Sequence, residues 1–288
     1  MSIQATRRQL LTAFCRLLFA ALPLLSSAVA DEPLLILRDG ELPLVISAPH
    51  GGRLEVPGAP VRKGDGLKKG PAGFFTGRDT GTEELALRVT ELLDEKLSGR
   101  VSCVISRVHR RYVDFNRPPE IGVEHQAARV VHDSYHEALR TAVRRVRTQH
   151  GRGLLVDIHG QGSSASTAFR GTSNGLTVKA LREQFTERAH TGPLSLTGLL
   201  QKRGWQVHPD PFTGQEQSGF TGGYIVKTYG SHQPQGIDAI QLELGADYRR
   251  EDVREQRAME LADAIADYAA QYLQQPQKPG NSTRDQAR

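Results

Sequence analysis

Residues Leu154–Gly162 (LLVDIHGQG) form the stretch that decides the fold. An apolar run that changes to Asp-Ile-His and then to glycine is typical of a buried strand that places a histidine at its C-terminal end, beside a loop with room for a ligand. Residues Leu44–Gly52 (LVISAPHGG) repeat this pattern. A single histidine at a strand end can equally be a structural residue. Because the pattern occurs twice, we expect His50 and His159 to bind one metal ion.

The chain as a whole has the composition of a globular protein. It contains 288 residues, of which 38% are hydrophobic and 24% are charged. One α/β domain of this size is ordinary. Alternating strand and helix patterns predict a single α/β domain over residues 31–273, with a mixed, mostly parallel central sheet and helices on both faces.

The first 30 residues have the features of a secretory signal peptide. They contain three arginines and no acid, then an apolar run over Leu17–Leu25, then Ala28–Ala30 (AVA) as a small-residue cleavage site. The apolar run is shorter than the roughly 20 residues that a membrane-spanning helix needs. Thr6–Leu11 (TRRQLL) resembles the twin-arginine export motif. We therefore expect a periplasmic or secreted protein, with no membrane contact once the signal is removed.

Charge and cysteine content exclude two classes of protein. Removing three arginines from 37 basic residues leaves 34 against 32 acidic ones, a net charge of +2. This balance gives no reason to expect nucleic-acid binding. Cys103 is the one cysteine outside the signal, so no intramolecular disulfide is expected, and it is most simply a buried strand residue. The sequence leaves the oligomeric state open.

The remaining elements follow from periodicity and turn signals. Leu34–Leu37 and Leu42–Ile46 flank Asp39-Gly40, which predicts a hairpin. Gly51–Gly81 is a long loop without periodicity, and loops of this length are often lids. Other predicted elements are a helix from Thr82, as N-cap, to about Ser98, a strand at Val101–Ser106, a helix at Glu124–Gln149 whose Arg and His residues mostly face solvent, strands at Leu154–Ile158 and Ile240–Leu244, helices at Ser195–Arg203 and Arg250–Tyr272, and a disordered tail at 274–288.

A catalytic zinc site usually has three protein ligands and one open position. Asp79 is the expected third ligand, with Glu83 and Glu84 as rivals, although Asp79 alone fits a turn or capping role as well. A metal hydrolase also needs an acid–base residue that is not a ligand. Glu243 interrupts an apolar strand, so it is either this residue or an outward-facing strand position.

Residues His109–Arg117 (HRRYVDFNR) bring guanidinium groups and an amide together. Such groups bind carboxylates in bidentate fashion and stabilise the oxyanion of a tetrahedral intermediate. A solvated basic loop is the alternative interpretation.

Taken together, six motifs resemble the N-formylglutamate amidohydrolase family in order and approximate spacing, from about Leu42 to Leu261. They are Pro49–Gly52 (PHGG), Asp79–Ala86 (DTGTEELA), Asp114–Arg117 (DFNR), Asp157–Gly160 (DIHG), Gly222–Lys227 (GGYIVK) and Gln241–Leu244 (QLEL). The resemblance implies a phosphorylase/hydrolase-like fold, similar to zinc carboxypeptidases and aspartoacylase, with one zinc ion at the C-terminal edge of the sheet.

The same resemblance implies roles for individual residues. They are His50, Asp79 and His159 as metal ligands, Glu243 as general base and acid, Arg110 polarising the scissile carbonyl, and Asn116, Arg117, Tyr224 and Lys227 binding substrate. Two positions depart from the expected patterns. Lys227 stands where an arginine is expected, and Arg53 stands where carboxypeptidases and aspartoacylase place a metal carboxylate.

These features predict an exported zinc amidohydrolase acting on a small carboxylate-bearing amide, such as an N-formylglutamate-like compound or an N-acyl amino acid. A zinc carboxypeptidase or cell-wall amidase on larger peptides is the second hypothesis, which an open cleft would favour over a lid. A third hypothesis is a non-catalytic carboxylate-binding protein. Metal content distinguishes the third from the others.

Overall fold

The computed structural model describes residues 32–70, 73–210 and 214–273. By contacts the chain divides into Met1–Glu32 and Pro33–Arg288, and all helices and strands described here belong to the second unit. The expected signal peptide and the expected tail at 274–288 lie outside the described residues. Within the described ranges, no helix combines the length and apolarity needed to span a bilayer.

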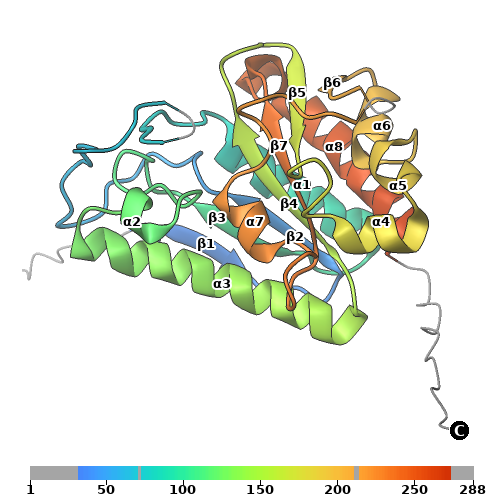
Figure 1. The fold of residues 1–288 in the computed structure, drawn as a ribbon, viewed down its shortest axis with the longest axis horizontal. Helices are drawn as coiled ribbons and strands as arrows, with labels where there is room; N and C mark the ends of the chain where they lie inside the picture. The colour runs from blue at the N-terminus through green and yellow to red at the C-terminus, as the bar shows by residue number, and fades with distance from the viewer. Residues whose placement is uncertain (1–31, 71–72, 211–213, 274–288) are drawn as a thin grey trace, which may run out of the picture. The chain divides into compact units, whose positions relative to one another are not determined.

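A mixed sheet forms the centre of this unit (Figure 1). Its order is β1-β3-β2-β4-β7-β5-β6. β1 is antiparallel to β3 and β5 is antiparallel to β7, while the other neighbouring pairs are parallel, so the predicted fold class is confirmed. The strands are β1 Leu35–Arg38, β2 Leu44–Ala48, β3 Ser102–Ser106, β4 Leu154–Gly160, β5 Thr167–Gly171, β6 Gln206–His208 and β7 Asp238–Leu244.

The predicted hairpin between the first two strands is wrong. β1 and β2 do not pair with each other but lie on opposite edges of β3. Gly40 connects them across the start of β3, where its N–H donates to Ser102 Oγ at 3.0 Å. A Cβ on Gly40 would lie 2.3 Å from the Arg100 carbonyl oxygen, so this crossing requires glycine.

Helices cover both faces of the sheet because adjacent strand residues point to opposite sides. Leu44 and Ile46 join an apolar cluster with α1 and α8, whereas Val45 joins one with α3 and α7. The helices are α1 Thr82–Leu97, α2 Pro119–Gly122, α3 Gln126–His150, α4 Lys179–Phe185, α5 Arg188–Thr191, α6 Leu196–Gln201, α7 Tyr224–Tyr229 and α8 Glu251–Tyr272, with a 3-10 turn at Ala246–Tyr248. Figure 1 shows α3 in front of the sheet and α1 and α8 behind it.

Two histidines of α3 are exceptions to the prediction that its Arg and His residues mostly face solvent. His132 and His136 are buried on the stripe that faces the sheet. His132 Nε2 lies 3.1 Å from the Arg117 carbonyl oxygen, and His136 Nε2 lies 2.9 Å from that of Phe115. The helix therefore fixes the segment after β3 that carries Asp114, Asn116 and Arg117. Gly151 ends the helix in a left-handed conformation.

The start of α1 also differs in detail. Gly81, with φ 88°, precedes the helix, and Thr82 is its first residue rather than its cap. The Thr82 hydroxyl instead donates to the Asp79 carbonyl oxygen at 2.8 Å. This bond holds the turn that carries the Asp79 side chain.

Candidate metal centre

The site lies at the carboxyl ends of three adjacent parallel strands, β2, β4 and β7. Ser47 is the register partner of Asp157, which is the partner of Gln241. One step further along, His159 is the partner of Glu243. Because side chains alternate along a strand, these polar residues share the face that is covered by α3 and α7. Open α/β sheets bind their ligands at this edge.

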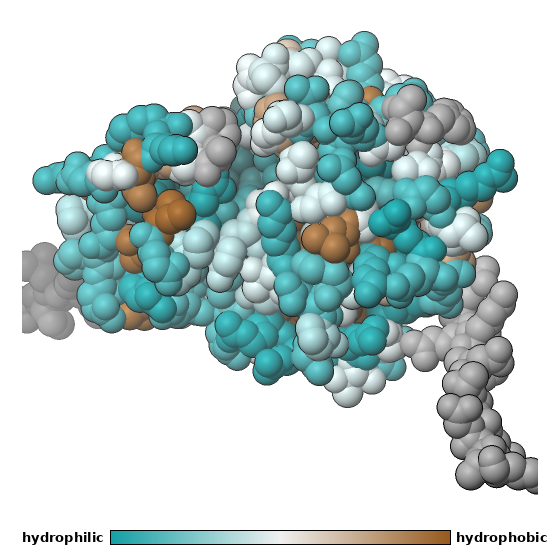
Figure 2. All heavy atoms as spheres, viewed as in Figure 1, coloured by the Kyte–Doolittle hydropathy of each residue, from teal (hydrophilic) through white to brown (hydrophobic). Residues whose placement is uncertain are grey.

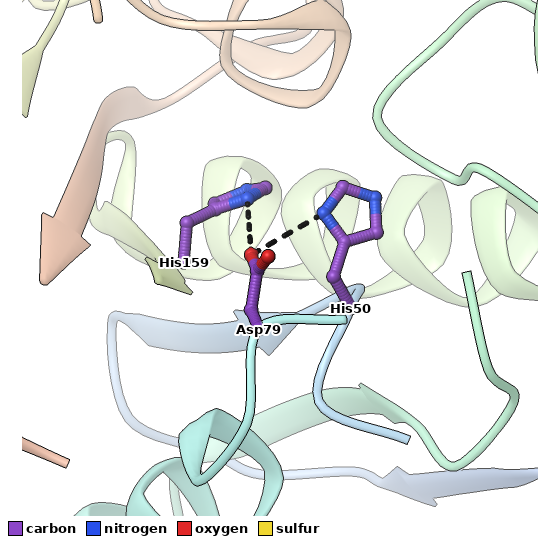
Figure 3. Close-up of side chains that lie close together, drawn as sticks. All are labelled: His50, Asp79 and His159. Carbon is purple, nitrogen blue, oxygen red and sulfur yellow. Dashed lines mark ion pairs between the residues drawn. The ribbon is translucent and has the colours of Figure 1, made fainter. Parts of the chain in front are cut away.

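His50, Asp79 and His159 converge at this edge (Figure 3). His50 follows β2, Asp79 precedes α1, and His159 lies near the end of β4. The Asp79 Oδ2 atom lies 3.5 Å from His50 Nδ1 and 3.4 Å from His159 Nδ1. One possible ligand atom from each residue lies within 4.8 Å of the others, and all three side chains are buried. The two imidazole rings that the sequence predicted to meet do meet.

This arrangement fits a metal ion. Donors that surround zinc tetrahedrally, with bonds of about 2.1 Å, lie about 3.4 Å apart, which matches both distances to Asp79. His50 Nδ1 is buried and has no hydrogen-bond partner among the described residues, as expected of a nitrogen directed at a cation. Two imidazoles and one carboxylate form a donor set that suits zinc. Of the three acids considered for the third ligand, the cluster contains Asp79 and neither Glu83 nor Glu84.

Two further carboxylates hold the imidazoles from behind. His50 Nε2 lies 2.9 Å from Asp114 Oδ1, and His159 Nε2 lies 2.8 Å from Asp157 Oδ2. Asp157 in turn accepts a hydrogen bond from Ser47 Oγ at 2.5 Å. Metal-binding histidines usually donate their second N–H in this way, which fixes the tautomer and leaves the other nitrogen for the metal. Asp114 and Asp157 belong to two of the six motifs, but no role was predicted for either acid.

The charges in the cluster reinforce one another. Burial acts to raise the pKa of Asp79, but the nearby imidazoles of His159 and His50 and the charge of Arg110 outweigh it, so the pKa is lowered. Burial acts to lower the pKa of His159, but Asp157 and Asp79 raise it to about 10. The carboxylates around His159 therefore stabilise a proton on its imidazole, and the same negative charges would stabilise a metal ion. Metal and proton compete for such a site.

Glu243 lies beside the cluster without belonging to it. Its Oε1 accepts a hydrogen bond from Gln241 Nε2 at 2.8 Å, and its side chain is partly exposed. Burial and the nearby Asp79 and Asp157 carboxylates raise its pKa to about 7, against the opposing charges of His159 and Arg110. A carboxyl group with this pKa both accepts and donates protons near neutral pH. Of the two interpretations of Glu243, the structure supports the inward-facing one.

Asn116 is part of the floor of the site. Its Oδ1 accepts from the Ile225 N–H at 2.9 Å, and its Nδ2 donates to Gln241 Oε1 at 3.2 Å. Nδ2 also lies 3.4 Å from His159 Nε2. The side chain is 4% exposed, so the amide joins α7, β7 and the ligand histidine.

Arg110 and Arg117 differ in how deeply their side chains are buried. The Arg110 guanidinium is buried, binds Asp114 Oδ2 at 2.8 Å and lies 4.0 Å from Asp79 Oδ1. Arg117 is partly buried, and it donates to the carbonyl oxygens of Gly73 at 3.2 Å and Asn116 at 2.8 Å. Arg110 therefore contacts the cluster directly, whereas Arg117 joins its own segment to the long loop.

Tyr224 and Lys227 lie on α7. The Tyr224 ring packs edge-on against His136, 5.3 Å between centroids. Lys227 is exposed. Glu83 pairs with Arg107 at 3.2 Å.

Comparisons with known proteins agree with this architecture. The family model described as N-formylglutamate amidohydrolase matches residues 123–248. The fold is similar to N-formylglutamate amidohydrolase from Ralstonia eutropha JMP134, with a TM-score of 0.53 and 17% identity over 82% of this chain and 98% of that one. It is also similar to a gene product from Agrobacterium tumefaciens, with a TM-score of 0.52 and 16% identity over 84% of this chain and 97% of that one. No curated protein matches the chain.

The matched residues include β4 and β7, and therefore His159 and Glu243, while His50 and Asp79 precede them. At these identities the solved structures show a shared fold. The similarity to the N-formylglutamate amidohydrolase family that the six motifs predicted is confirmed by the family model over residues 123–248.

Proposed function

We propose that the protein is an exported zinc-dependent amidohydrolase that cleaves an amide bond of a small carboxylate-bearing substrate, such as an N-formylglutamate-like compound or an N-acyl amino acid. The convergence of His50, Asp79 and His159 beside Glu243 is the observation that carries this proposal. The match to the N-formylglutamate amidohydrolase model supports the reaction class.

His50 Nδ1, Asp79 Oδ2 and His159 Nδ1 would hold the ion, with Asp114 and Asp157 fixing the two imidazoles. Zinc in such a site supplies Lewis acidity and lowers the pKa of its water to about 7. Glu243 would take a proton from the attacking water and pass it to the nitrogen of the departing amine. Gln241 holds Oε1 of Glu243, so the other oxygen carries the proton.

The guanidinium groups of Arg110 and Arg117 are the reason for proposing a substrate that carries a carboxylate. Arg110 lies within reach of the cluster and would polarise the scissile carbonyl, while Arg117 has one terminal nitrogen, Nη2, without a hydrogen bond to a described residue. A guanidinium with a free terminal N–H pair suits a carboxylate. Figure 2 shows a hollow between the 51–81 segment and the end of the sheet that carries β5, lined mostly by hydrophilic residues.

A second candidate function, a carboxypeptidase or cell-wall amidase on larger peptides, is favoured by the anchoring of the long loop. The guanidinium of buried Arg62 donates to three carbonyl oxygens, and the Glu124 carboxylate accepts from two loop N–H groups at 2.7 Å each. A loop held in this way stays in place beside the site rather than closing over it, which would leave room for a larger substrate. The carbonyl partners of Arg62 are Phe75, Arg110 and Ile121.

Three measurements test the proposal. Purified protein should contain about one zinc ion per chain, and turnover should stop with a chelator and return with zinc. Hydrolysis of formylglutamate, N-acyl amino acids, short peptides and muropeptides, compared by kcat/KM, then assigns the substrate class. A metal-free protein that binds carboxylates without hydrolysing any amide would contradict the enzyme proposal.

Export forms a separate part of the proposal and rests on the sequence of residues 1–30. In a bacterial host, the full chain should be found in the periplasm or medium, with an N-terminus near Asp31. Replacing Arg7 and Arg8 by lysine should block export if the twin-arginine route is used. Export of this variant at the wild-type level would contradict that route.

A further inference from the structure

Arg249 lies just after β7, outside every motif that the sequence singled out. It is partly buried, and its guanidinium donates hydrogen bonds only to backbone carbonyl oxygens of the described residues. These are Leu244 at 2.9 Å, Thr80 at 2.5 Å and Gln161 at 3.0 Å. We propose that Arg249 is the positioning residue of the metal centre, because one guanidinium joins the three segments that carry Asp79, His159 and Glu243.

Each of the three acceptors lies within two residues of a site residue. Thr80 follows Asp79, Leu244 follows Glu243, and Gln161 is two residues after His159. Two of these segments also meet directly, since the Gly160 N–H donates to Asp79 Oδ2 at 3.0 Å. Arg249 therefore fixes the distance between Asp79 and His159, the two residues that would bind the same metal ion.

The surrounding backbone leaves room for this side chain. A Cβ on Gly160 would lie 2.7 Å from both Cζ and Nε of Arg249, so a side chain at that position would displace the guanidinium. A Cβ on Gly81 would lie 2.3 Å from the Arg249 carbonyl oxygen. Both glycines flank the site, in two of the three segments that Arg249 connects.

A guanidinium is suited to this task because it offers five N–H donors in a rigid plane, which a lysine does not. Its charge has no carboxylate partner among the described residues and acts on the site instead. Burial lowers the pKa of Arg249, while the charges of Asp79 and Glu243 raise it. The same charges mean that Arg249 favours the ionised forms of both carboxyl groups.

This inference rests on the proposed metal site, and its test separates the two. Arg249→Gln and, as a matched control, Arg250→Gln are compared with the wild type; Arg250 is exposed and pairs with Asp247 and Asp252 on the surface. Zinc affinity is measured by competition with a chelator, and the Co2+-substituted protein reports ligand geometry through its visible absorption. We expect roughly 10- to 100-fold weaker zinc binding and an altered cobalt spectrum in R249Q alone.

A second variant keeps Arg249 and moves its guanidinium. Gly160→Ala should weaken zinc binding to a similar degree, and the double variant should be no weaker than either single one, because both act on the same contact. Additive losses, or wild-type affinity and an unchanged cobalt spectrum in folded R249Q, would overturn the inference.

Hydrogen exchange of the metal-free protein provides a readout that needs no ion. The Gly160 N–H bound to Asp79 should lose protection in R249Q and keep it in R250Q. If the wild type binds no zinc but the Gly160 N–H loses protection in R249Q alone, the proposed function fails while the positioning role of Arg249 stands. Equal protection in all three proteins overturns the positioning role.

Discussion

The two ends of β7 carry the same chemical group in different surroundings. Asp238 begins the strand and Glu243 lies one residue before its end. Burial raises the pKa of both carboxyl groups, to about 6 for Asp238 and about 7 for Glu243. A shifted pKa alone therefore does not separate a structural acid from a chemical one.

The partners separate them. Asp238 Oδ1 accepts from Ser231 Oγ at 2.6 Å and from the Leu181 N–H at 3.2 Å, and its register partner on β4 is Leu154. Glu243 accepts one bond, from Gln241, and its register partner is His159. The first carboxylate joins elements, whereas the second lies next to possible metal ligands.

The largest contrast is expected from removing each negative charge with little change of shape. Glu243→Gln should lower kcat by roughly 10²- to 10⁴-fold, the usual contribution of general acid–base catalysis, without loss of bound zinc. Asp238→Asn should leave kcat within about twofold. Steady-state kinetics with metal analysis of both variants checks this, and an active E243Q would remove Glu243 from the mechanism.

A smaller effect is expected at the residue behind a ligand. Asp157→Asn keeps the size of the side chain but weakens its bond to His159 Nε2. We expect zinc affinity to fall roughly 10- to 100-fold, as for other carboxylates that support ligand histidines. Chelator competition measures this, with D238N as control. Unchanged affinity in D157N would show that His159 does not bind the metal through Nδ1.

Zinc affinity should also depend on pH, because His159 beside Glu243 must lose a proton when the ion binds. Because the pKa of His159 is raised to about 10, zinc must displace its proton at every lower pH. Affinity should therefore fall about tenfold per pH unit as the pH is lowered from 9 to 7. Zinc titrations at several pH values, with calorimetry to count released protons, test this. A pH-independent affinity would contradict it.

The smallest effect is expected on stability, at the Asp238 end. A raised carboxyl pKa means that the folded state binds the proton more tightly, so this contribution to stability is present below pH 4 and is lost as the pH rises to about 6. The raised pKa of Asp238 corresponds to at most about 3 kcal/mol in the free energy of unfolding. In D238N the stability should no longer fall in this way as the pH rises. Urea unfolding of both proteins at pH 4 and 7 measures the difference, and equal pH dependence would refute the assignment.

Much of this edge of the sheet could be predicted from sequence. β2 and β4 are runs of buried residues with a histidine shortly after the strand or near its end, so their type and the meeting of His50 and His159 followed from pattern alone. β5 (TAFRG) and β6 (QVH) are short and partly polar, and their pairing is fixed by distant residues. No local signal marks such strands.

The residues behind the ligands show the same limit. Asp157 is two positions before His159 on one strand, so the alternation of side chains already placed both on one face. Nothing local assigns Asp114 to His50, 64 residues earlier in the chain, or Arg249 to the Thr80 carbonyl oxygen. The failed hairpin has a similar cause, because Asp39-Gly40 fits a turn equally well when the next strand pairs elsewhere.

The anchoring of the 51–81 segment has a consequence for how this protein can diversify. Arg62 and Glu124 fasten its early part, while Gly66 and Gly70 have positive φ values and open space around them. Length and sequence can therefore vary between these two glycines while His50 and Asp79, at either end of the segment, keep their places. The range of compounds admitted and the reaction performed on them can thus change independently over evolutionary time.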